Sequence, residues 1–144
     1  MADYAKDEAR IREIVEQMFE AISWSADKAP DFTAFAGAVR KDAVLAPSAR
    51  PLSPTDIETF VGRMRGQYES GGMKIFDERA NKTIVKVFGN LAVAIGSYRA
   101  QIDGGPVGRG ANGFLLVRND GDWQIAAMGW DSEGEDKPLP AELA

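Results

Sequence analysis

The sequence predicts an α+β fold in which about three N-terminal helices pack against a curved, mostly antiparallel sheet. In the first half of the chain, apolar residues recur every three or four positions, as on a helix with one buried face. From Met73 onward they alternate in runs separated by glycine-containing turns, as in strands. Helices followed by a meander of strands indicate one layered domain.

The first predicted helix ends near Trp24–Ser25 and has one broad apolar stripe. Asp7 and Glu8 fall in its first turn, where acidic side chains complement the helix dipole. The stripe consists of Ile11, Ile14, Val15, Met18, Phe19 and Ile22.

Two further helices are predicted before the strands begin. A short one covers Asp31–Val39. In the other, Ser53 is the expected N-cap, Pro54 takes the first helical position and Asp56 is the capping-box acid. Gly71–Gly72 ends this helix. Its apolar stripe is Ile57, Phe60, Val61, Met64 and Tyr68.

Five strands are expected, the first of them short. The long second strand is expected to bend or bulge near Asn81–Lys82. Asp120–Gly121 is a strong signal for the hairpin before the last strand. The predicted strands cover Ala43–Ala46, Met73–Phe88, Leu91–Ile102, Val107–Val117 and Trp123–Ser132.

Length and charge restrict the domain organisation and the partners. The 144 residues indicate one domain over residues 1–133, followed by an acidic tail, 134–144, that we expect to be flexible. A net charge of −5 without a cluster of basic residues argues against nucleic-acid binding. The glycine-rich segment 104–113 precedes a strand instead of a helix, so it does not predict a phosphate site.

The chain contains neither cysteine nor histidine, which narrows its chemistry. The chain can form no disulfide and has no thiolate nucleophile or imidazole base. Any acid–base catalysis must therefore use Asp, Glu, Tyr or Lys. We expect no cofactor and no metal. The charged N-terminus does not resemble a signal peptide, and no apolar run is long enough to cross a membrane. We therefore expect a cytoplasmic protein without a membrane partner.

The order of elements over residues 5–133, with Gly89–Ala94 and Asp120–Ile125 entering two strands, resembles the nuclear-transport-factor-2-like superfamily and its SnoaL-like branch. The resemblance implies a cone-shaped barrel with an apolar cavity between helices and sheet, and dimerisation through the outer sheet face. Many relatives carry histidines on the inner face of the last strand, where this chain has Ala127 and Gly129. Their His–Asp chemistry cannot apply here.

An apolar cavity is predicted where the helices face the sheet. Simple alternation along the last strand places Ala127, Gly129 and Asp131 on the face of Trp123 and Ile125, with Asp131 near the mouth. The predicted lining is Trp24, Phe35, Phe60, Met64, Tyr68, Asn112, Ala127 and Gly129.

Asp131 is the first candidate for a general base, because apolar walls raise the pKa of a carboxyl group. Asp77 and Arg79 share a strand face and complete an Asp–Arg–Asp set of the kind that the resemblance suggests. Each has a simpler interpretation: Asp131 as a solvated acid, Asp77 and Arg79 as an exposed salt bridge. Glu78 points inward instead if the register differs by one residue.

These observations predict a protein that binds a small hydrophobic molecule, with cofactor-free isomerase, cyclase or hydrolase chemistry on a carboxylate base as the catalytic version. The alternatives are a non-catalytic association module and a relative that has lost activity. Apolar residues on both faces of the last strands predict a homodimer through the outer sheet face, including Met128 and Trp130.

Overall fold

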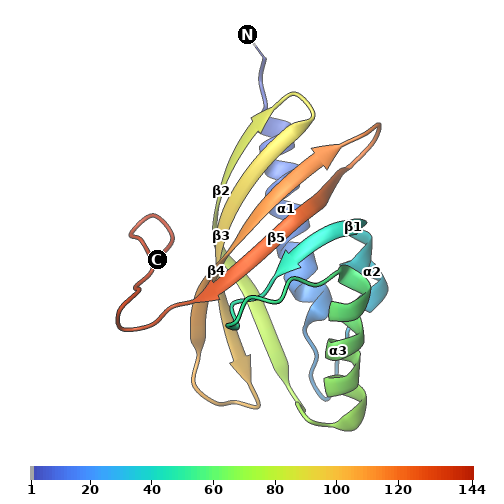
Figure 1. The fold of residues 1–144 in the computed structure, drawn as a ribbon, viewed down its shortest axis with the longest axis vertical. Helices are drawn as coiled ribbons and strands as arrows, with labels where there is room; N and C mark the ends of the chain where they lie inside the picture. The colour runs from blue at the N-terminus through green and yellow to red at the C-terminus, as the bar shows by residue number, and fades with distance from the viewer. Residues whose placement is uncertain (1) are drawn as a thin grey trace.

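The computed structural model describes residues 2–144 and has three helices against one five-stranded sheet (Figure 1). The strand order is β1-β5-β4-β3-β2; β1 runs parallel to β5 and all other neighbours are antiparallel. The predicted α+β fold is confirmed, although β1 and β2 are the two edge strands of the sheet and the barrel is not closed. The elements are α1 (Ala5–Ile22), α2 (Phe32–Gly37), β1 (Val39–Ala46), α3 (Ile57–Ser70), β2 (Phe76–Phe88), β3 (Leu91–Ile102), β4 (Gly108–Arg118) and β5 (Trp123–Ser132).

Helix α1 supplies a large part of the core. All six residues of its predicted stripe are at most 4% exposed. Burying a large apolar side chain stabilises the fold by about 1.5–3 kcal/mol, so this stripe is enough to fix the helix against the sheet. The helix ends at Ile22, two residues before the predicted end, and the chain then pairs with β2 through Trp24 and Phe76.

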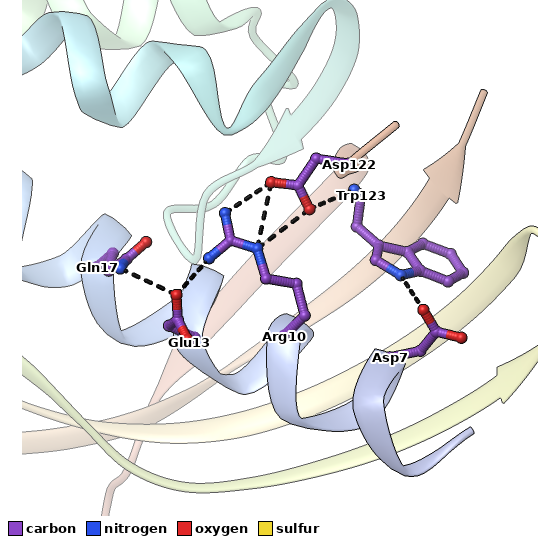
Figure 2. A network of polar contacts seen from close by, with 6 residues as sticks. All are labelled: Asp7, Arg10, Glu13, Gln17, Asp122 and Trp123. Carbon is purple, nitrogen blue, oxygen red and sulfur yellow. Dashed lines mark hydrogen bonds and ion pairs between the residues drawn. The ribbon is translucent and has the colours of Figure 1, made fainter. Parts of the chain in front are cut away.

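Polar contacts tie the start of α1 to the β4–β5 turn, as Figure 2 shows. Arg10 donates to both carboxylate oxygens of Asp122, with Nη2 2.6 Å from Oδ2, and also to Glu13. The indole Nε1 of Trp123 donates to Asp7 over 3.1 Å. These contacts fix the start of α1 against the β4–β5 turn, which is far from it in the sequence.

Several predicted boundaries are wrong by a few residues. Asp31 caps α2 by accepting from the Ala34 amide, but the helix stops at Gly37 and Val39 already belongs to β1. Helix α3 starts at Ile57, not near Pro54, because Asp56 is the N-cap and accepts from the Thr59 amide at 2.7 Å. Strand β2 starts at Phe76 and β4 at Gly108.

The end of α3 and the turn before β5 agree with the sequence. Gly71 lies in the left-handed region at φ 72°, which favours glycine and ends the helix. Asp120 and Gly121 both have positive φ, as the hairpin signal predicts.

Strand β2 bulges where its length predicts, because its pairing with β3 shifts between Ala80 and Thr83. The buried hydroxyl of Ser97 accepts from Asn81 Nδ2 and from the Lys82 amide, which satisfies polar groups of the bulge. Before the bulge, Phe76 is buried and Ala80 packs on the core. By alternation Glu78 shares this inner face.

A second bulge, in β5, changes the orientation of the strand's second half. Leu116 pairs with Ile125 but Leu115 pairs with Ala127, so Ala126 is an extra residue. Simple alternation therefore fails beyond Ile125, and the predicted placement of Ala127, Gly129 and Asp131 on the inner face is wrong.

Met128 and Trp130 are instead the inward residues of β5 after the bulge. Met128 is 6% exposed, and the Trp130 ring lies 5.5 Å from that of Phe60 on α3. Their predicted position on the outer sheet face is wrong for the same reason.

The segment after β5 leaves the sheet and loops back on itself (Figure 1). Two ion pairs hold its base, Arg109 with Glu133 at 2.9 Å and Lys137 with Asp131 at 2.8 Å. Leu143 near the end is only 3% exposed. The flexibility of residues 134–144 stays a prediction.

Candidate functional site

A pocket of about 200 Å³ lies between the helices and the inner face of the sheet. Every helix contributes to it, together with β2, β4 and β5, so residues distant in sequence form one wall. Its lining is Met18, Phe19, Ile22, Phe35, Phe60, Met64, Met73, Phe76, Glu78, Asn112, Met128 and Trp130. Ten of these twelve side chains are aromatic or aliphatic, and the two exceptions are Glu78 and Asn112.

Four of the predicted lining residues reach this pocket: Phe35, Phe60, Met64 and Asn112. Trp24 does not; it is buried behind the pocket wall, where its Nε1 donates to the Met73 carbonyl at 3.0 Å. Tyr68 packs its ring 5.4 Å from the Trp24 ring and is partly exposed.

Ala127 and Gly129 are also absent from the pocket, because of the bulge in β5. On β5 the larger side chains of Met128 and Trp130 line the pocket in their place.

Glu78 supplies the only carboxyl group in the pocket lining. The residue is partly exposed along the edge of the sheet, yet burial raises the pKa of its carboxyl group from 4.5 to about 7. Desolvation is the cause, since within residues 2–144 no hydrogen bond or charge partner stabilises the carboxylate. Near neutral pH this group both accepts and donates a proton, as a general base or acid must.

Ser23 holds the backbone of Glu78 in place. Its hydroxyl accepts from the Glu78 amide at 2.9 Å and lies 2.9 Å from the Phe19 carbonyl, to which it donates. The end of α1 thus fixes the position of β2 at the residue that carries the carboxyl group.

On its other side, Glu78 borders an open groove of about 420 Å³ between α1 and β2. Glu16, Glu20 and Lys28 also line this groove. Lys28 is engaged there, because its ammonium group donates to the carbonyls of Glu20 and Ser23 at 2.7 Å. The groove connects Glu78 to a charged part of the surface.

Asn112 is the other polar side chain of the pocket. It lies on β4 opposite Trp130 and is 3% exposed. Its Oδ1 atom accepts no hydrogen bond from any residue that the structure describes. A buried acceptor without a donor costs about 1–3 kcal/mol, so the unpaired Oδ1 atom destabilises the folded state.

The three residues predicted as catalytic lie on the surface. Asp131 is exposed, and a hydrogen bond from Lys137 lowers the pKa of its carboxyl group. Asp77 and Arg79 form an exposed ion pair at 3.1 Å. The Asp–Arg–Asp set is therefore not assembled in the pocket. Glu78, which alternation in the other register would have selected, takes the inward position between Phe76 and Ala80.

A larger groove of about 470 Å³ lies at the opposite end of α1, beside Arg10, Asp122 and Trp123. Arg10 and Asp122 in this groove already pair with each other, as Figure 2 shows. We therefore place the candidate site in the smaller apolar pocket, where polar groups are unpaired.

The described part of the chain, residues 2–144, contains no group of three or more acidic side chains arranged to hold a metal ion. None of its helices combines the length and apolarity that a membrane crossing requires.

Neither the family models nor the curated proteins contain a match to this sequence. Solved structures do match. An NTF2-like protein of unknown function from Shewanella baltica is 13% identical with a TM-score of 0.64, over 94% of this chain and 100% of that one. The chain has the NTF2-like fold.

Two further structures with the same arrangement come from Novosphingobium aromaticivorans. A provisionally assigned aromatic ring hydroxylase is 16% identical with a TM-score of 0.72, over 93% of each chain. A provisionally assigned scytalone dehydratase is 11% identical with a TM-score of 0.70, over 90% of this chain and 85% of that one. At these identities the similarity shows the NTF2-like fold alone, and the SnoaL-like branch stays a prediction.

Proposed function

We propose that this protein binds a small, largely apolar molecule in the pocket between helices and sheet, and that Glu78 exchanges a proton with it. The observation that carries the proposal is a single carboxyl group, without a partner among residues 2–144, in a lining whose other side chains are apolar except that of Asn112. Apolar walls exclude water from a bound ligand, and a desolvated carboxylate is a stronger base than a solvated one.

The reaction class that fits this site is cofactor-free proton transfer, as in isomerisation, cyclisation, hydration or dehydration. One carboxyl group can remove a proton from one atom of the ligand and return it to another. The provisional dehydratase among the similar structures is compatible with this class. Asp131 is replaced as the candidate base by Glu78.

Benzisoxazole tests the base without knowledge of the natural substrate. Removal of its ring C–H proton drives the electron pair into a nitrile and breaks the N–O bond; the phenolate oxygen then takes up a proton, giving ortho-hydroxybenzonitrile. We expect the protein to catalyse this reaction, with a rate that rises with pH and is half-maximal near pH 7, because the carboxylate form is the base. Product absorbance measures the rate.

Glu78→Gln should reduce this rate about 100-fold or more, the usual contribution of a positioned base. Asp77→Asn, one residue away on the outer face, is the matched control and should leave the rate unchanged. If wild type binds the probe and Glu78→Gln reacts as fast, proton transfer by Glu78 is refuted. That result would favour the alternative of a binding or association module without catalysis.

We also propose a homodimer through the outer sheet face, with a different set of residues from the one expected. A row of exposed or half-exposed apolar side chains crosses four paired strands: Val44, Ala127, Leu115 and Val93. The neighbouring Leu91 and Ile95 on β3 are 47% and 43% exposed. A contiguous apolar patch of this kind is typical of an interface.

A further inference from the structure

Asn112 is the second polar group of the pocket, and none of the described residues donates a hydrogen bond to its Oδ1 atom. On the inner face it lies between strand neighbours Gly96 and Trp130, neither of which donates to its side chain. Phe114 and Met128, the next inward pair on β4 and β5, are buried and apolar. Leucine at this position would satisfy packing without the cost of an unpaired acceptor.

An acceptor that is buried, unpaired and part of a pocket lining is suited to a ligand's donor. Oδ1 requires an O–H or N–H group, which ketones, ethers and hydrocarbons lack. A pocket built to receive such a hydrogen bond discriminates against analogues without the donor, because the protein group then remains unpaired.

Glu78 decides between a hydroxyl and an ammonium donor. No charged group stabilises its carboxylate in the pocket, and close to neutral pH a large fraction carries a proton. A hydroxyl group is uncharged, so it can lie in the same pocket as that protonated carboxyl group without burying a charge. An ammonium ion has donors only and would have to be desolvated along with an ionised Glu78, which is costly.

Pocket size limits the rest of the ligand. An apolar cavity of about 150 Å³ accommodates benzene, so about 200 Å³ holds one ring with a short substituent. Aromatic and methionine side chains line most of the surface and suit a flat or puckered ring.

We infer that the ligand of this pocket is a neutral, ring-sized alcohol or phenol whose hydroxyl group donates a hydrogen bond to Asn112 Oδ1. The inference rests on the proposed function, in which this pocket binds a small apolar molecule. It adds the class of ligand and a residue that selects it.

The test compares four probes of similar size on the full-length chain by NMR titration: phenol, toluene, anisole and benzylamine. Phenol should bind about tenfold more tightly than toluene, because it alone gives Oδ1 an uncharged donor. Anisole keeps the oxygen but lacks the hydrogen, so it should bind like toluene. Chemical-shift changes should map to residues of the pocket lining.

Asn112→Leu should remove the preference for phenol and bind toluene at least as well as wild type does. Asn119→Leu makes the same change in the exposed β4–β5 turn and should leave all four affinities unchanged. The wild-type comparison of phenol with anisole stands without the variant, should Asn112→Leu fold poorly.

The outcomes separate this inference from the proposed function. Equal affinities for phenol, anisole and toluene would overturn the role of Asn112 while an apolar binding pocket remains. Tighter binding of benzylamine than of phenol would overturn the hydroxyl class. If even toluene fails to bind in the pocket, the proposed function itself is wrong.

Discussion

Glu78 shows what alternation in a strand can and cannot predict at the scale of one residue. The sequence places Asp77 and Glu78 on opposite faces but leaves open which of them is inward. The apolar residues Phe76 and Ala80 indicate that Glu78 is the inward one, since they share its strand face and flank it. Asn112 was predicted at the pocket, but its missing donor depends on every surrounding side chain and has no signal in the sequence.

Glu78 should also make stability depend on pH. Its pKa is higher in the folded protein (about 7) than in the unfolded chain (about 4.5), so the folded state binds the proton more tightly. The free energy of unfolding should therefore fall as pH rises from about 4.5 to above 7, by at most roughly 3 kcal/mol from this group. Below pH 4.5 the group is protonated in both states and has no effect.

Urea denaturation at pH 5 and pH 8 measures this contribution. Glu78→Gln cannot ionise, so its stability relative to wild type should increase from pH 5 to pH 8. Asp77→Asn is the control on the outer face and should show no such gain. An equal difference between Glu78→Gln and wild type at both pH values would mean that the carboxyl group is solvated.

At the scale of elements, the two bulges account for both the success and the failure of the site prediction. The bulge in β2 was predictable because a run from Met73 to Phe88 is too long for one regular strand. The bulge in β5 was not, because the run Ala126–Ala127 in a ten-residue strand reads as regular alternation. That one extra residue moved Asp131 outward and brought Trp130 into the pocket.

The start of α3 depends on which of several candidate cap residues reaches a backbone amide. Ser53, Pro54 and Asp56 all favour a helix start, but only the Asp56 carboxylate reaches a free amide of the first turn, that of Thr59. The stripe of α1 was predicted correctly because tertiary packing against a sheet requires one continuous apolar face and no particular cap.

At the scale of the whole molecule, the helices cover only the inner face of the sheet, and the outer face keeps its apolar row from Val44 to Val93. The order and type of the elements could be predicted from the sequence, because periodicity and turn signals are local. Which residues in the second half of β5 face outward could not, because the bulge reverses the alternation for the rest of that strand.

The outer face should support a dimer in solution. Mass measurement by light scattering should give twice the monomer mass. Val93→Glu should convert the protein to a folded monomer, because a buried, unpaired carboxylate between the apolar side chains of Leu91 and Ile95 opposes association. Lys86→Glu, opposite Val93 on the edge strand, makes a change in charge at the rim and should affect the mass much less. A monomeric wild type at micromolar concentration would contradict the dimer.

The central claim is that an unpaired, desolvated carboxyl group lines an apolar pocket. Its most direct test is an NMR titration of the Glu78 side-chain carboxyl carbon in the full-length protein, assigned by comparison with Glu78→Gln. The account predicts a midpoint near pH 7. A midpoint near the ordinary value of 4.5 would show a solvated glutamate and contradict the proposed site.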